Sequence, residues 1–506
     1  MQETLHNGPR QPEIRSKFAY YSSILSNLMS YGTTIVPVFF LNIYYDTITN
    51  ERNNNWDTNT RKNKLSKINL CYNLGGLVGI LVAFLLTKYN PRVVLNISRF
   101  IISACCVSLA VPDITTIMVS RFFSNLFAIV SQIAVIWIVY EFYLVRDQAK
   151  IMVAIALSIP LNNLLMSVSS KFDSGDKWYW KQVLGYMPLM LMMGIVIDIF
   201  CTGSLNSVTY LLRERGRETT VEELSKIFSE EYTENLVKKF EIQLKNEQKD
   251  RRKLEERGVS QWAMDSMVYK SSLINLLVIS FLGAMGFQIQ YMSNGLLIGS
   301  KELSDTVATQ NTKTAMTAET MVELTSYVVA LFFNLTKKRK RTLMLALFFA
   351  SLVLSCTSIG YLIQDLRIVR LGIALLGVSF AFNLPSIHMY TNDLVPQSLV
   401  PIQSVCCVSV NMIADALFPL VFNFENSEYT TIGLKFGFLV LVAVVSLGAM
   451  YFLMIETDGM TRDQIRLRLK NRGAGRPEIK FEEGNGFVEL ENSSTRKDVE
   501  SELKQD

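Results

Sequence analysis

Long apolar segments recur along the whole chain, and short polar stretches separate them. Each segment is about 20 residues long, which is the length that an α-helix needs to cross the hydrocarbon core of a bilayer. A long charged stretch divides about twelve such segments six and six. They lie near 18–45, 67–88, 93–112, 115–143, 148–170, 180–203, 271–298, 314–335, 342–363, 368–392, 400–423 and 430–455. The pattern predicts an all-α membrane protein.

The same pattern divides the chain into five regions. Two six-helix halves are predicted at 18–203 and 270–455. Between them, 204–269 mixes Glu and Lys with apolar residues at helical spacing, which is typical of amphipathic helices lying beside a bundle. The tails 1–17 and 456–506 are polar, and the second is expected to be largely disordered.

The distribution of Lys and Arg predicts how the segments are oriented. Basic residues gather at 337–341, at 213–217 and at the start of the last tail. All of these fall on one side if both termini and the central segment are cytoplasmic, as the positive-inside rule favours. The exception is 46–66, where basic and acidic residues are mixed. We therefore expect a multi-pass membrane protein with both termini in the cytoplasm.

Composition mainly argues against several other kinds of function and partner. The net charge of +5 is explained by this topology and gives no reason to expect nucleic acid as a partner. The seven cysteines lie in apolar segments and show no metal-ligand spacing, so no metal is predicted. With two histidines and no nucleophile–base set or phosphate-binding loop, the chain is not expected to be an enzyme or to hold a cofactor.

Short motifs recur at the ends of the segments. A glycine pattern that allows close helix packing precedes a basic turn at the end of the second segment. The motif residues are Gly75, Gly76, Gly79, Lys88 and Arg92; Ser207, Tyr210, Leu211 and Leu212; Pro385 and Asp393; and Glu456, Thr457, Gly459 and Thr461. Taken in order over about residues 20–466, these motifs resemble the sugar porters of the major facilitator superfamily, the facilitative glucose transporter group.

The resemblance implies two six-helix halves that rock about a central site, with cytoplasmic ion pairs that latch the outward-facing state. The matching residues in the first half are Arg92, Glu141 and Arg146. In the second half they are Arg341 and Asp393. Pairs near a membrane interface can be made and broken at modest cost, which suits such a latch.

This chain departs from the family pattern at several latch positions. Glu141 and Arg146 are closer by two residues than the family spacing, and Lys88 stands where an acidic residue is usual. Val400 stands where an arginine is expected after Asp393. The latch is therefore predicted to be incomplete.

The positions that bind the sugar in the family are also only partly conserved in this chain. Asn411 matches, and Gln288 stands where the family has asparagine. Ionisable groups occupy or adjoin other positions: Glu323, His388 and Asp415. Because intramembrane acids usually face a wet cavity or a partner, these five residues form the predicted solute-binding set.

Three functions stay open. The first is an alternating-access transporter for facilitated diffusion of a hexose or a related small polar solute, with this solute and the lipid bilayer as its partners. The second is an organic-ion or proton-coupled carrier that uses the intramembrane acids. The third is a sugar sensor that binds without transport. The sequence leaves the oligomeric state open.

Overall fold

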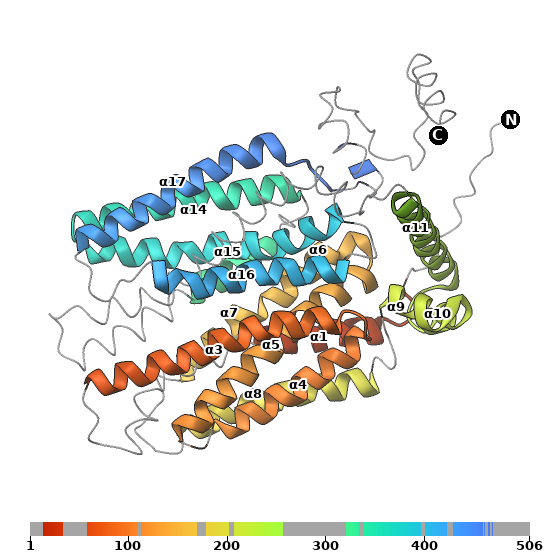
Figure 1. The fold of residues 1–506 in the computed structure, drawn as a ribbon, viewed down its shortest axis with the longest axis horizontal. Helices are drawn as coiled ribbons and strands as arrows, with labels where there is room; N and C mark the ends of the chain where they lie inside the picture. Colours follow the sequence, from red (N-terminus) through yellow and green to blue (C-terminus); the bar gives the residue numbers. More distant parts are fainter. Residues whose placement is uncertain are drawn as a thin grey trace, which may run out of the picture.

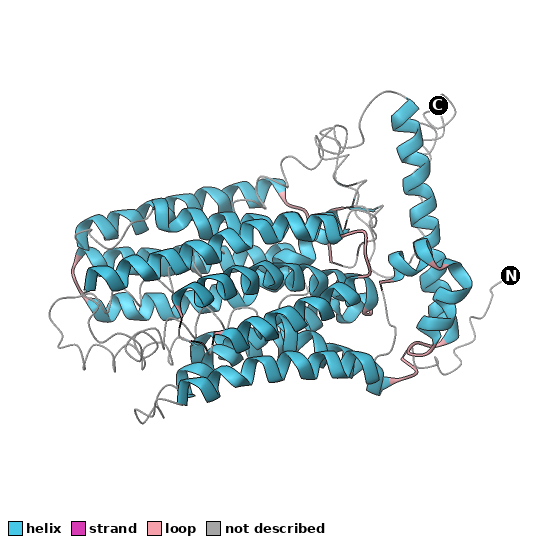
Figure 2. Cartoon of the chain, turned by 60° about the horizontal axis from the view of Figure 1, so that its bottom comes forward, coloured by secondary structure: helices cyan, strands magenta, loops and turns pink. Residues whose placement is uncertain are grey.

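The computed structural model describes residues 14–33, 58–109, 111, 113–169, 179–201, 207–256, 320–332, 338–395, 400–421, 429–458, 460, 464–465 and 468. Within these residues the regular elements are helices, and one isolated β-bridge joins Ile14 to Phe228 (Figure 2). The helices are α1 (Lys17–Thr33), α3 (Thr58–Leu86), α4 (Pro91–Ser108), α5 (Ile114–Phe142), α6 (Val145–Ala156), α7 (Ser158–Ser169), α8 (Tyr179–Phe200), α9 (Val208–Glu214), α10 (Gly216–Ser225), α11 (Glu230–Glu256), Thr320–Phe332, α14 (Arg339–Leu362), α15 (Leu366–Leu394), α16 (Val400–Val421) and α17 (Tyr429–Leu453).

These helices overlap every predicted apolar segment except 271–298, which lies outside the described residues. Within the described ranges, six helices are long and apolar enough to cross a membrane, and four shorter ones are also apolar. The predicted segment 148–170 is formed by two helices, α6 and α7, which meet at Leu157. Pro160 follows this junction and lacks the backbone N–H that would continue the helical hydrogen-bond ladder.

Polar side chains mark where several of the long helices begin. The Asn90 side chain accepts a hydrogen bond from the Arg92 backbone N–H at 2.9 Å, and Pro91 starts α4. Asp113 caps α5 by accepting from the Thr116 N–H at 3.2 Å. Asp365 does the same for α15. Each cap satisfies an orphan N–H of the first turn, which fixes where the span starts.

The helices of the bundle form two groups (Figure 1). The first helix group is α1 and α3 to α8, with α5 packed against α3 and α4. The second helix group is Thr320–Phe332 and α14 to α17, with α14 packed against α15 and α17. The groups meet where α16 packs on α3 and α5, and where α15 packs on α6.

Glycines let α3 lie directly on α5. A Cβ atom on Gly75 would come within 2.2 Å of the Phe122 carbonyl oxygen, and one on Gly79 within 2.7 Å of the Leu126 carbonyl oxygen. No larger residue fits at either position without a shift of the backbone. The predicted close helix packing at this glycine motif is confirmed.

Helices α9, α10 and α11 lie together beyond one end of the bundle (Figure 1), which we call the α10 end. Phe228, between α10 and α11, is fully buried and contacts the rings of Tyr20, Phe142 and Tyr232. The backbone N–H groups of Arg15 and the following residue both donate to the Ile227 carbonyl. These contacts fasten the charged segment to α1 and α5 of the first helix group.

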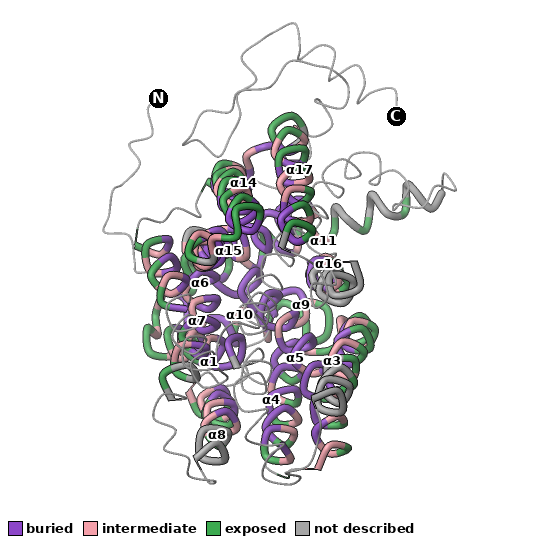
Figure 3. Tube along the Cα trace, turned by 90° about the vertical axis from the view of Figure 1, so that its left-hand side faces the viewer, coloured by how far each residue is buried: buried purple, intermediate pink, exposed green. Residues whose placement is uncertain are grey.

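Burial is distributed as expected for a membrane bundle. Buried positions concentrate where helices face one another, and α5 is buried over most of its length (Figure 3). Large apolar side chains such as Phe200, Phe332 and Phe452 point outward and are at least 70% exposed. Such an apolar outer face is stable against lipid, because lipid tails are as apolar as the side chains.

Candidate functional site

One polar contact joins the two helix groups at the α10 end. The Tyr140 hydroxyl on α5 donates to Asp393 Oδ1 on α15 at 2.9 Å, and the other carboxylate oxygen pairs with Arg339 at the start of α14. All three side chains are buried. We call Tyr140, Arg339 and Asp393 the inter-group contact, since Tyr140 belongs to the first group and the other two belong to the second.

The sequence predicted Arg341 beside Asp393, but the structure places Arg339 there. Two residues along a helix rotate the side chain by about 200°, so Arg339 and Arg341 point in nearly opposite directions. Arg339 lies on the buried face of α14, and Arg341 is exposed. Asp393, one of the residues predicted to gate, is part of the inter-group contact.

The structure does not bring Arg92 to Glu141. Glu141 is buried and accepts hydrogen bonds from Ser207, from the Thr209 hydroxyl at 2.9 Å and from the Thr209 backbone N–H at 3.3 Å. This carboxylate therefore joins the end of α5 to the start of α9. The Arg146 backbone lies in α6, but its side chain is outside the described residues.

Arg92 instead belongs to a buried ionic network inside the first helix group. Asp198 on α8 pairs with Arg99 on α4 at 2.7 Å, and Arg92 Nη1 lies 3.9 Å from the same carboxylate. We call Arg92, Arg99 and Asp198 the ionic network. Hydroxyl groups of α1 complete it: Ser26 donates to Asp198 at 2.7 Å, and Ser23 accepts from Arg92 at 2.9 Å.

The sequence analysis missed Arg99 and Asp198, although a signal was present. Both are charged residues within predicted spans, 93–112 and 180–203, and charges in such positions usually have a partner or line a cavity. The sequence could not show that they face each other, because they are distant along the chain and meet only when α4 packs on α8.

A third set of polar side chains, besides the inter-group contact and the ionic network, is buried in the bundle on α1, Thr320–Phe332, α15 and α16. Glu323 and Tyr327 are buried on Thr320–Phe332, and Tyr327 lies near Glu323 and near Tyr31 on α1. His388 on α15 is buried, and its Nδ1 lies 3.4 Å from the sulfur of Cys407 on α16. Tyr31 also lies near Cys407. We call these five residues the central cluster.

The central cluster holds two of the five predicted solute-binding residues, Glu323 and His388. Gln288 lies outside the described residues. Asn411 and Asp415 lie on α16, but their side chains are not described. Tyr31 was not predicted, because a tyrosine in an apolar segment is indistinguishable by sequence from a packing residue.

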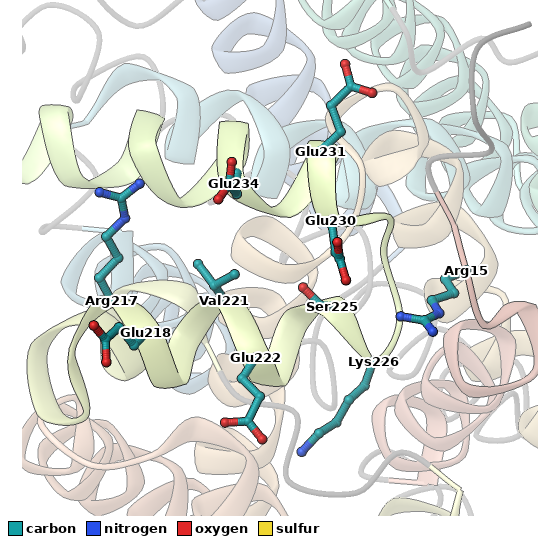
Figure 4. A pocket seen from close by; sticks show the side chains of 10 residues that line it. All are labelled: Arg15, Arg217, Glu218, Val221, Glu222, Ser225, Lys226, Glu230, Glu231 and Glu234. Carbon is teal, nitrogen blue, oxygen red and sulfur yellow. The ribbon is translucent and has the colours of Figure 1, made fainter.

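An open cleft of about 1110 Å³ lies outside the bundle, between α10 and α11 (Figure 4). Glu218 and Glu222 come from α10, Glu230 and Glu234 from α11, and Arg15 lies at one side. On the exposed part of α11, Lys245 donates to Glu241 at 2.9 Å and so lowers the pKa of that carboxyl. Solvated pairs of this kind are worth little energy, so this charged surface adds little to the stability of the fold.

Comparison with known proteins identifies the family. The family model of the Major Facilitator Superfamily matches residues 24–419, and the chain belongs to this family. A search of curated proteins finds no match.

Solved structures share the fold. The proton:xylose symporter XylE bound to 6-bromo-6-deoxy-D-glucose superposes with a TM-score of 0.71 at 13% identity, over 89% of this chain and 98% of that one. A double tryptophan mutant of XylE gives a TM-score of 0.73 at 14% identity, over 89% and 99%. The partially occluded inward-open form of the xylose transporter XylE from E. coli gives 0.63 at 11% identity, over 88% and 100%.

The family membership establishes the general class. The chain is an integral, multi-pass membrane transporter of solutes and not an enzyme, as the sequence predicted. At these identities the likeness to XylE concerns the fold alone. The chemical identity of the solute depends on the residues of this chain.

Proposed function

We propose that the protein is a sugar-porter-like transporter that moves a hexose or a related small polar solute by facilitated diffusion and alternating access. In this proposal twelve helices span the membrane, both termini and α9 to α11 are cytoplasmic, and the protein resides in the plasma membrane. The solute site is formed by Glu323 and His388 of the central cluster together with Gln288, Asn411 and Asp415.

The inter-group contact is the observation that carries the proposal. Alternating access requires that the two helix groups close at one end and then separate there. The hydroxyl–carboxylate bond from Tyr140 to Asp393 joins the groups at the α10 end, and Arg339 holds the carboxylate in place. A hydrogen bond to a charged group contributes about 1.5 to 3 kcal/mol, which is comparable to the free-energy difference between two populated states. The α10 end is then the closed cytoplasmic end.

Counterflow in proteoliposomes tests the proposal. Liposomes with purified protein are loaded with unlabelled D-glucose, D-xylose or a polyol, and uptake of the labelled solute is followed. Saturable uptake of a D-sugar, without uptake of labelled L-glucose, is the expected result. Binding of a sugar without any counterflow would overturn transport and favour the sensor.

Proton-coupled transport is the second candidate, because Glu323 and His388 are ionisable and buried inside the bundle. A carboxylate and an imidazole at such a depth can take up and release a proton with the solute. In that case an inward proton gradient accelerates uptake and Glu323→Gln abolishes the acceleration. In the facilitative case uptake is unaffected by the gradient.

A further inference from the structure

Arg121 is a buried arginine that the functions described above do not use. It lies on α5, about two turns from the Ile114 end and therefore far from the inter-group contact. The residue is 1% exposed. Among the described residues, neither its Nε nor its Nη1 finds a hydrogen-bond partner.

The described surroundings of the guanidinium do not satisfy its N–H groups at Nε and Nη1. Its central carbon lies 5.2 Å from the centre of the Tyr72 ring on α3, and Cys106 on α4 is within electrostatic reach. An aromatic face attracts a cation but offers no lone pair to the directed N–H donors. No carboxylate of the described residues interacts with Arg121.

Arg99 shows what this chain provides when a buried arginine is purely structural. Its Nη1 donates to Asp198 and to Asn96, both at 2.7 Å. Its Nη2 donates to the Ser26 carbonyl and hydroxyl, and its Nε donates to Ser30. The two arginines are equally buried, but among the described residues Arg99 has a counter-ion and acceptors, whereas Arg121 has no counter-ion and no acceptor at Nε or Nη1.

Arg121 also lies next to the boundary between the helix groups. One turn along α5, Asn125 donates to the Tyr72 carbonyl at 2.8 Å. A Cβ on the adjoining Gly76 would approach Asn125 at 2.8 Å and Met412 of α16 at 3.1 Å. The first and second groups therefore touch one turn from Arg121, and solute sites of two-halved transporters lie at such a boundary.

We propose that Arg121 binds an oxyanion, a carboxylate or a phosphate group, carried by the transported solute. The planar guanidinium presents parallel N–H donors that match two oxygens of such a group, and it remains charged when buried. The solute then supplies the counter-ion that the described residues do not. This inference rests on the proposed transport function and narrows its substrate class to acidic polar solutes such as sugar acids.

A matched pair of probes tests the inference. D-glucuronate differs from D-glucose by a carboxylate in place of the terminal hydroxymethyl group, and inorganic phosphate and chloride serve as separate anion probes. Thermal stabilisation and counterflow are measured with the parent protein, with the Arg121→Gln variant and with a control variant. The control is Arg217→Gln, which removes an exposed charge on α10.

The expected result is stabilisation by glucuronate or phosphate that is at least about tenfold weaker in apparent affinity in Arg121→Gln and unchanged in Arg217→Gln. Stabilisation by both glucuronate and phosphate identifies a general oxyanion site. Stabilisation by glucuronate alone identifies a site for the sugar acid. Without ligand, Arg121→Gln should melt no lower than the parent, because it removes an uncompensated charge.

Three outcomes overturn the inference: neither oxyanion stabilises the protein more than chloride does, Arg121→Gln binds as the parent does, or Arg121→Gln is strongly destabilised without ligand. The proposed function fails separately. Counterflow of glucose without glucuronate binding keeps transport and removes the oxyanion site. Arg121-dependent glucuronate binding without counterflow of any solute keeps the oxyanion site and removes transport.

Discussion

Two sets of buried charges in this protein are built in contrasting ways. The ionic network of Arg92, Arg99 and Asp198 lies within the first helix group, and serines of α1 bond to its charged groups: Ser26 to Asp198, Ser23 to Arg92 and Ser30 to Arg99. The inter-group contact of Tyr140, Arg339 and Asp393 has a single described hydrogen bond that crosses between the groups. Among the described residues, polar contacts are dense within the first helix group and sparse at the α10 end between the groups, where the proposed transport cycle requires them to separate.

The difference has an energetic reason. A charge inside a bundle is stable only when its partners are fixed, so the ionic network requires α1, α4 and α8 to keep their arrangement. In the proposed alternating-access cycle a contact between the groups is broken each time they separate, so it can contribute only a few kcal/mol. Variants in the two regions should therefore change different properties.

The largest effect is expected in the ionic network. Asp198→Asn leaves Arg92 and Arg99 without their carboxylate, and breaking a buried pair in this way costs about 3 to 5 kcal/mol of unfolding free energy. Thermal melting of the purified protein measures the loss. Asp365→Asn is the matched control, because asparagine retains the helix cap of α15 and should leave the melting temperature nearly unchanged. Equal melting of the two variants would contradict the structural role of the network.

A smaller effect, and one of a different kind, is expected at the inter-group contact. Arg339→Gln removes the cation beside Asp393 and should destabilise the closed α10 end by about 2 kcal/mol, with little change in global melting. Hydrogen–deuterium exchange at the end of α15 should become faster. Arg341→Gln, on the exposed side of the same helix, should leave the exchange as it is. The reverse result would restore Arg341 as the partner of Asp393.

The smallest effect is expected from a single oxygen atom. Tyr140→Phe removes the hydroxyl that joins α5 to Asp393 and retains the ring. The closed end should lose about 1.5 kcal/mol, the lower end of the range for a hydrogen bond to a charged group, since the Asp393–Arg339 pair remains. Exchange at the end of α15 and the rate of counterflow report this change. A loss as large as that of Asp198→Asn would mean that the contact is structural and does not open.

The fold was largely predictable from the sequence, and the partners of the charged residues were not. The lengths of the apolar segments predicted the helices, and the glycines at 75 and 79 predicted the close packing of α3 on α5. Asp393, which the family resemblance marked as a latch residue, lies in the inter-group contact. The sequence could not choose between Arg339 and Arg341, because that choice depends on the rotation of α14 within the bundle.

The sequence by itself determined where this chain can cross a membrane, because hydrophobic length is a local property that each segment carries alone. It also determined the residue types available for a polar site. Only the tertiary structure decided that Arg99 has a carboxylate and that Arg121 has none among the described residues. Whether a buried charge is compensated depends on residues far away in the chain, and helix packing alone brings those residues within hydrogen-bond distance.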